Sequence, residues 1–153
     1  MAGKTSLLYD TFILYQCVGT MLQRALLPAP LGPEEYAIYS YIFEYENCTP
    51  SEMSRDLNMP IQTVSDWVRL LRKRGHLASV TNDRDRRSFR MSLTETGREV
   101  HRQTNHHFEH VNRLFVRRLA RSERELRGYL QEIIGAAQDA TIAIDHERLT
   151  GTG

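Results

Sequence analysis

Apolar residues recur along the first part of the chain with the period of an α-helix. From residue 4 to residue 26 they are spaced by three and four, which places them on one face. They are Leu8, Phe12, Tyr15, Val18, Leu22 and Ala25. Pro28 and Pro30 end this pattern, and Pro33 suits the first turn of the next one. We therefore predict helices over Lys4–Leu26 and Pro33–Glu46.

Two shorter helical patterns follow, joined by a very tight turn at Asn58 and Met59. Thr49 and Pro50 are typical of the start of a helix, which is predicted to end near Leu57. The second helix is predicted over Pro60–Arg74, where Gly75 stops it. Its apolar positions are Ile61, Val64, Trp67, Val68 and Leu71. Two short helices joined in this way form a helix-turn-helix unit, whose second helix can enter a DNA major groove.

After Gly75 the pattern changes from a helical period to alternation. Leu77–Thr81 and Arg87–Leu93 are predicted as strands, and in the second one apolar and polar residues alternate strictly. The polar loop Asn82–Arg86 lies between them. A β-hairpin placed directly after the second helix of a helix-turn-helix unit is a wing.

Two long helices complete the chain. Thr94 is predicted to cap a helix over Glu95–Leu119, and Ser122 with Glu125 forms a capping box for a last helix ending near His146. The apolar residues of that last helix have the spacing of a helix–helix seam. They are Leu126, Leu130, Ile133, Ala137, Ala140 and Ile144.

These elements predict a mainly α fold with a small β-hairpin wing: a winged helix-turn-helix plus long helices. Residues 33–94 are predicted to form the DNA-binding lobe. Residues 1–32 and 95–148 hold the long helices, and residues 149–153 are predicted to form a flexible tail.

The distribution of charge supports a polyanionic partner, although the net charge of the chain is only +1. Between Arg55 and Arg98 there are ten basic and five acidic residues, a net charge of +5, whereas the rest of the chain carries −4. A basic segment within an otherwise acidic protein is typical of nucleic-acid binding.

Several other classes are excluded by the sequence. No run of eighteen apolar residues is present, and the apolar start lacks the features of a signal peptide, so we expect a cytoplasmic protein without membrane contact. Two cysteines are too few for a disulfide framework. Neither a Gly-rich phosphate loop nor a nucleophile or metalloprotease motif is present, so we expect neither an enzyme nor a cofactor.

Two motifs give the chain a resemblance to a known family. Asp85-Arg86-Arg87 is followed after five residues by Leu93-Thr94-Glu95-Thr96-Gly97, and the recognition-helix pattern runs from Leu57 into Leu71-Arg72-Lys73-Arg74-Gly75. With the order of elements given above, the chain resembles the MarR family of transcriptional regulators over residues 5–146. The resemblance implies a homodimer that binds a pseudo-palindromic DNA operator, with half-sites roughly 34 Å apart. It also makes residues 1–32 and 95–148 the dimerisation helices.

The resemblance also assigns roles to individual residues. The recognition helix would read bases or contact phosphates, the wing arginines would enter the minor groove, and further polar residues would bind phosphate. The predicted DNA-binding residues are Gln62, Thr63, Ser65, Asp66, Arg69, Arg72, Lys73, Arg84, Arg86, Arg90, Ser51 and Arg55. Asp85 and Arg87 are predicted to stabilise the wing. An acid near phosphates is unfavourable, so Asp66 either accepts from a cytosine amino group or pairs with Arg69.

Regulation by a small aromatic or lipophilic effector is the family's common mode. The resemblance places such a ligand at the aromatic second helix, and the predicted pocket residues are Tyr15, Leu22, Tyr36, Tyr39 and Phe43. Aromatic residues at helical spacing are more often part of a core than of a pocket. The resemblance makes a repressor released by the effector the first hypothesis.

Three alternatives remain open from the sequence. His106 and His110, one turn apart, have the spacing of a pair of zinc ligands. Cys17 or Cys48 would serve a redox-responsive regulator, although neither has an activating neighbour in sequence. The lobe would also suit a winged-helix module that binds protein instead of DNA.

Overall fold

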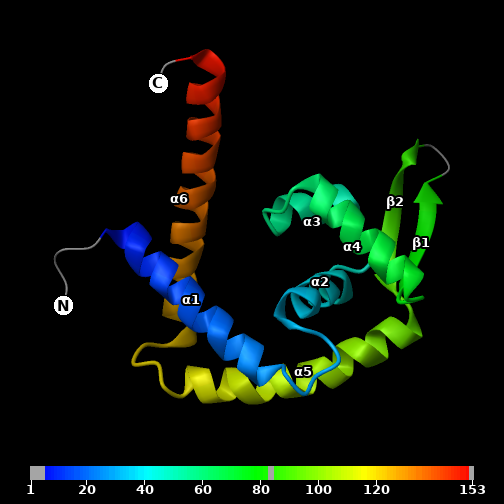
Figure 1. Ribbon diagram of the computed structural model, residues 1–153, viewed down its shortest axis with the longest axis horizontal. Coiled ribbons are helices and arrows are strands. Elements are labelled where there is room, and N and C mark those ends of the chain that lie inside the picture. Colours follow the sequence, from blue (N-terminus) through cyan, green and yellow to red (C-terminus); the bar gives the residue numbers. More distant parts are fainter. Residues whose placement is uncertain (1–5, 83–84, 152–153) are drawn as a thin grey trace. The chain divides into compact units, whose positions relative to one another are not determined.

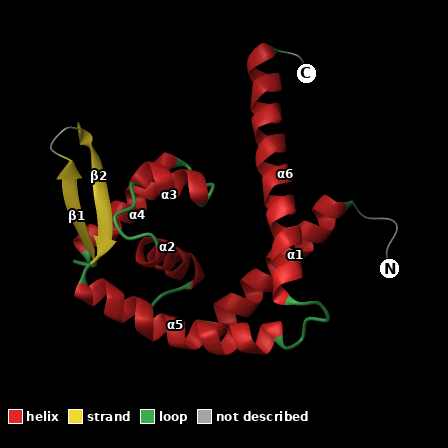
Figure 2. Cartoon of the chain, turned by 180° about the vertical axis from the view of Figure 1, so that it is seen from behind, coloured by secondary structure: helices red, strands yellow, loops and turns green. Residues whose placement is uncertain are grey.

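A computed structural model describes residues 6–82 and 85–151, without the side chains of residues 81–88. Its elements are α1 (Leu7–Ala25), α2 (Pro33–Glu44), α3 (Pro50–Asp56), α4 (Ile61–Lys73), β1 (Leu77–Asn82), β2 (Asp85–Leu93), α5 (Glu95–Val116) and α6 (Glu123–Thr150). The predicted fold class is confirmed: the chain is mainly helical with one two-stranded antiparallel hairpin (Figure 2).

The chain divides into two compact units, Met1–Asn112 and Arg113–Gly153. The first unit holds α1 to α4, the hairpin and most of α5, and the second holds the last turn of α5 and all of α6. These units differ from the predicted division into dimerisation helices and DNA-binding lobe, because α1 and most of α5 fall in the same unit as the lobe. The predicted division concerns the role of each helix and stays a prediction.

The core of the first unit lies where α2, α3, α4 and the hairpin meet (Figure 1). α2 contributes five of the buried side chains, and α4 and the two strands contribute three each. The others come from α3 and from connecting segments. The most deeply buried residues are Ile38, Tyr39, Ile42, Met53, Val64, Leu71 and Met91. Trp67 packs half-buried against this cluster, as the sequence predicts for a core position.

Local signals in the sequence explain the helix ends. The side chain of Thr49 accepts a hydrogen bond from the backbone N–H of Glu52, whose carboxylate in turn accepts from the N–H of Thr49 at 2.7 Å. Gly75 has a φ of 72°, a left-handed conformation that ends α4 and that glycine adopts without steric cost. Ser122 and Glu125 form the predicted capping box of α6.

Several predicted bounds are wrong by a few residues. α2 ends at Glu44 and α5 at Val116, because no glycine or proline marks either end in the sequence. β2 begins at Asp85, since Asn82 and Asp85 are paired across the hairpin, so the loop is shorter than predicted. α6 continues to Thr150, where Gly151 with a φ of 67° ends it. The predicted flexible tail is therefore helical at Leu149 and Thr150, and residues 152–153 lie outside the described residues.

α1 packs at one end only. Leu26 is buried just beyond it, and Leu22 and Ala25 are half-buried, whereas the predicted apolar face continues over exposed residues toward the N-terminus. Leu8, Phe12 and Tyr15 are 78%, 53% and 72% exposed. α6 also leaves apolar residues uncovered, since it buries none of its residues and exposes several large apolar side chains.

Candidate nucleic-acid interface

α4 presents a polar stripe to solvent. Gln62, Asp66, Arg69 and Lys73 are all exposed and follow one another at helical spacings of four, three and four. Val64, Val68 and Leu71 occupy the opposite side and are buried in the core. α3 and α4 are joined by a turn in which the Ser54 hydroxyl donates to the carbonyl of Met59 at 2.6 Å. The helix-turn-helix unit therefore holds α4 with its polar side outward.

The charged residues of this stripe are partly paired. Arg69 Nη1 lies 3.1 Å from Asp66 Oδ1, which is the pairing that the sequence offered as one explanation of this acid. Thr63 and Ser65 are half-buried on either side of the stripe, and the Ser65 hydroxyl donates to the carbonyl of Ile61. The ammonium group of Lys73 is exposed and has no ion pair or hydrogen bond among the residues that the structure describes.

Two of the predicted phosphate-binding arginines are held by neighbours. Arg55 Nε donates to Asp56 Oδ1 at 2.8 Å, and Asp56 also accepts from the Tyr41 hydroxyl. These two donors hold the pKa of Asp56 below its ordinary value. Arg90 Nη1 donates to the carbonyl of Asn47 at 2.8 Å. Ser51 is exposed in the first turn of α3.

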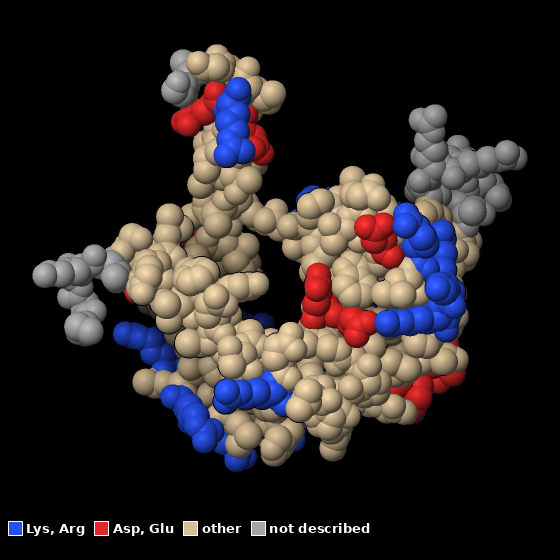
Figure 3. Space-filling view, viewed as in Figure 1, with Lys and Arg blue, Asp and Glu red and all other residues tan. Residues whose placement is uncertain are grey.

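The predicted wing residues are only partly described. Arg84 lies outside the described residues, and so do the side chains of Asp85, Arg86 and Arg87. Their roles stay predictions. In the part of the first unit that holds α4 and the hairpin, Lys and Arg side chains gather in a band, with acidic side chains beside it (Figure 3).

The base of the wing is tied to the end of α4 and the start of α5. The Thr94 hydroxyl donates to the carbonyl of Gly75 at 2.8 Å and accepts from the N–H of Gly97, and the Thr94 N–H donates to the carbonyl of His76. The L-T-x-x-G part of the family motif therefore closes a junction of three elements. Leu93, the first residue of this part of the motif, is buried in the core, so the motif stabilises the base of the hairpin.

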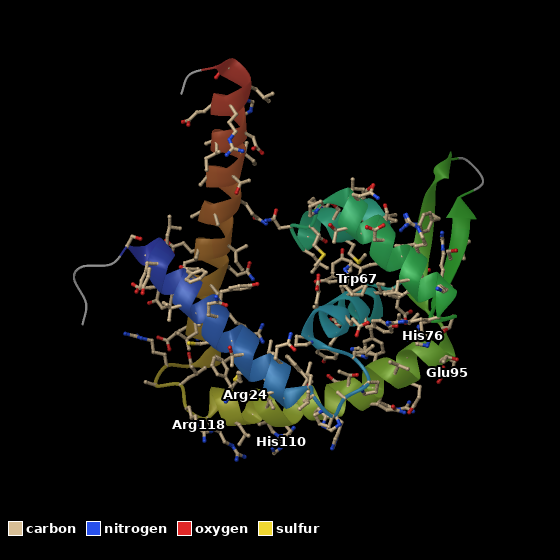
Figure 4. The ribbon with its side chains drawn as sticks, in the orientation of Figure 1. Arg24, Trp67, His76, Glu95, His110 and Arg118 are labelled. Atoms are coloured by element: carbon tan, nitrogen blue, oxygen red, sulfur yellow. The ribbon has the colours of Figure 1, made fainter. Side chains whose placement is uncertain are left out.

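Sequence reasoning missed a second tie at this junction. The Tyr39 hydroxyl and Nδ1 of His76 are 2.7 Å apart, and Arg74 Nη2 lies 2.9 Å from Glu35 Oε1. Figure 4 shows His76 beside the end of α4 and the start of α5. Partners so far apart in sequence carry no local signal, so only the fold brings them together.

The five predicted pocket residues are spread over different surroundings. Tyr39 is fully buried in the core, Leu22 is half-buried and Tyr15 is exposed. Tyr36 and Phe43 lie on either side of His101, whose ring stacks on both at centroid distances of 5.4 and 4.5 Å. An imidazole ring thus occupies the slot between these two aromatic residues.

His101 is itself a site residue that sequence reasoning missed. It is buried, and its Nε2 lies 3.1 Å from the Ser40 hydroxyl. The Tyr36 hydroxyl of α2 donates to Oδ1 of Asn105, which lies on α5 like His101, at 2.6 Å. Burial lowers the pKa of His101 below the ordinary 6.5, because the charged imidazolium loses solvation.

We expect the protein to lose stability as the pH falls from about 7.5 to about 5.5. The unfolded chain takes up a proton at His101 near the ordinary pKa, whereas the folded chain resists it, so the unfolded state binds more protons in this range. His76, whose pKa burial also lowers, adds to the loss. Urea unfolding at both pH values measures it, and His101→Gln should reduce the pH dependence. An unchanged pH dependence in that variant would contradict the assignment.

The zinc and redox alternatives gain no support from the described residues. Among them no group of three or more histidines, cysteines or acids is arranged to hold a metal, and His106 and His110 are both exposed on α5. Cys48 is buried, and burial raises the pKa of its thiol to about 11, which disfavours the reactive thiolate. Cys17 is exposed.

In the described residues no helix has the length and apolarity needed to span a bilayer.

Comparison with known proteins shows the fold. No protein-family model and no curated protein sequence matches the chain. Many solved structures do. A MarR transcriptional regulator from Methanosarcina mazei aligns with a TM-score of 0.68 at 16% identity, covering 86% of this chain and 96% of its own. The chain has the MarR winged-helix fold.

Two further structures with the MarR fold were solved with bound partners. MepR of S. aureus, in complex with DNA, aligns with a TM-score of 0.74 at 16% identity and covers 87% of this chain and 99% of its own. The regulator PcaV of Streptomyces coelicolor, in complex with its natural ligand, aligns with a TM-score of 0.69 at 20% identity, covering 92% and 99%.

Proposed function

We propose that this chain is a transcriptional regulator of the MarR family that binds duplex DNA as a homodimer and is not an enzyme. The observation that carries the proposal is the polar stripe on α4, the second helix of a helix-turn-helix unit directly followed by a wing. The DNA complex of the similar MepR supports the same use of the fold. We further propose that it acts as a repressor.

The recognition stripe suits base readout in the major groove. Gln62 lies at the start of α4, the end that reaches base edges, and glutamine pairs well with adenine. Asp66 and Arg69 neutralise each other in the free protein, so Arg69 becomes available to guanine or phosphate only where Asp66 finds another donor. A cytosine amino group is such a donor.

The homodimer is supported by apolar surface that each unit leaves uncovered. α1 exposes seven large apolar side chains, which are Leu7, Leu8, Tyr9, Phe12, Ile13, Leu14 and Tyr15. α6 exposes Tyr129, Leu130, Ile134, Ile142 and Ile144. Soluble monomers rarely leave such contiguous apolar surface in water. A second copy of the chain would bury it, and a two-fold dimer would then read two half-sites of a pseudo-palindrome.

For the effector, we propose a small aromatic or lipophilic molecule that competes for the slot between Tyr36 and Phe43. His101 fills this slot in the free protein, so a flat ligand would have to displace its ring. The slot joins α2 of the lobe to α5, and a change there alters how the lobe is held. The ligand complex of the similar PcaV supports an effector for this fold.

Selection of bound duplexes from a random-sequence library tests the proposal. We expect enrichment of one pseudo-palindromic sequence, bound saturably in excess competitor DNA. Absence of any enriched sequence, or binding that competitor abolishes, would contradict the proposal and favour a winged-helix module that binds protein.

We expect Gln62→Ala to change base preference without changing the fold. Loss of a base contact costs about 1–3 kcal/mol at one position of each half-site and relaxes the preference there. Repeating the selection with the variant measures this. Ser51→Ala is the control, because a phosphate contact weakens all sequences alike. An unchanged preference in Gln62→Ala would remove this residue from base readout.

A further inference from the structure

The side chain of Arg72 bridges the recognition helix and both strands of the wing. Arg72 lies in the last turn of α4, and its Nη2 donates to the Ser79 hydroxyl on β1 at 3.2 Å. Its guanidinium carbon lies 4.3 Å from the centroid of the Phe89 ring on β2. One residue of α4 therefore contacts each strand.

This bridge lies at the partly buried edge of the core between α4 and the hairpin. The register pairs Ser79 with Met91 and Thr81 with Phe89, so Ser79, Phe89 and Met91 share one face of the hairpin. Met91 is fully buried in the core, whereas Phe89 is half-buried and Ser79 is exposed. Phe89 packs against the core at its edge, and Arg72 lies over the outer face of its ring.

The chemistry of the contact requires an arginine. A planar guanidinium can lie over an aromatic ring and still donate in its own plane, which an ammonium group cannot do in the same geometry. Because one N–H of the Arg72 guanidinium donates to Ser79 and its carbon lies over the Phe89 ring, the side chain is oriented toward the hairpin. Its neighbour Lys73 is exposed and has no such contact among the described residues.

We propose that Arg72 is a positioning residue, which holds the wing against the recognition helix so that both are presented to DNA as one rigid body. This inference rests on the proposed DNA-binding function. It gives Arg72 the role of a link within the protein, whereas the sequence places it among the residues that contact DNA.

Hydrogen exchange of the free protein tests the link without DNA. We expect Arg72→Lys, Arg72→Gln and Phe89→Leu each to speed exchange at the amides of Val80 and Arg90, which are paired across the hairpin. The double variant Arg72→Gln/Phe89→Leu should add little to either single change, because both remove the same contact. Lys73→Gln is the matched control and should leave exchange unchanged.

The same variants separate a link from a phosphate ligand when DNA is bound. We expect Arg72→Lys, which keeps the charge, to weaken binding to the selected duplex by about two- to five-fold, with the salt dependence unchanged. A phosphate ligand predicts near wild-type binding for Arg72→Lys. It also predicts a salt slope reduced by about 0.9 in Arg72→Gln.

The outcomes are distinguishable from failure of the proposed function. Wild-type exchange at Val80 and Arg90 in the Arg72 variants would overturn the link, and so would equal effects of Lys73→Gln. If the wild-type protein selects no DNA sequence, the proposed function fails, whereas the exchange experiment still decides whether Arg72 holds the wing.

Discussion

Replacing Phe12 by glutamate is expected to turn the protein into a monomer and to weaken its binding to a two-half-site duplex by about 10²–10⁴-fold. Phe12 is 53% exposed on α1, in the middle of an apolar face that runs from Leu8 to Tyr15. A carboxylate placed there would be buried without a partner in the proposed dimer, which is strongly unfavourable. Binding of the second half-site would then no longer be intramolecular.

Sedimentation velocity and fluorescence anisotropy measure the two effects. A duplex with one half-site should bind the variant as it binds a wild-type lobe, because the helix-turn-helix unit does not include α1. Ala37→Glu is the matched control: Ala37 is exposed on α2, and the same charge is introduced there without touching the apolar face. A dimeric Phe12→Glu protein with unchanged affinity would contradict the assignment of α1 to the dimer interface.

Replacing Gly97 by alanine is expected to lower the free energy of unfolding by about 1–3 kcal/mol. A Cβ atom at this position would lie 2.4 Å from the carbonyl oxygen of His76. That oxygen is part of the backbone and accepts a hydrogen bond from Thr94, so no side-chain rotation relieves the contact. α5 would have to move away from the base of the wing, which also disturbs the hydrogen bond between Gly97 and Thr94.

Urea unfolding measures the loss, with Gly128→Ala as the control. Nothing lies within 4 Å of a Cβ built at Gly128 in α6, and alanine is favoured over glycine in a helix by about 1 kcal/mol. We therefore expect the control variant to be as stable as the wild type or slightly more so. Equal stability of the Gly97→Ala protein would show that the junction yields easily, against the geometry described above.

The parts of the fold that the sequence predicts well are those with local signals. The period of apolar residues, Gly75 and the Ser122–Glu125 capping box determine helices within a few residues of where they lie. The sequence predicts an α6 that is four residues too short, because its apolar seam ends near Ile144. The stop signal was nevertheless present, in Gly151.

The candidate site is predicted less completely, because residue type does not tell which side chains are already engaged. The sequence places the arginines at 55, 72 and 90 together among the predicted DNA-binding residues. In the structure each is held by a different partner, and two of these partnerships depend on how the hairpin packs. Tyr39 shows the same limit: its helical spacing suits a pocket wall, yet the fold places it in the core beside His76.

The contact of Arg72 with both strands constrains the spacing of the DNA contacts within each half-site of the operator. If helix and wing form one rigid body, the number of base pairs between the bases under the helix and the flanking bases under the wing is fixed. Each inserted base pair turns the flanking minor groove by about a tenth of a helical turn away from the wing. New operators for such a protein would then evolve much more readily by base substitutions within a half-site than by changes in the distance between its parts.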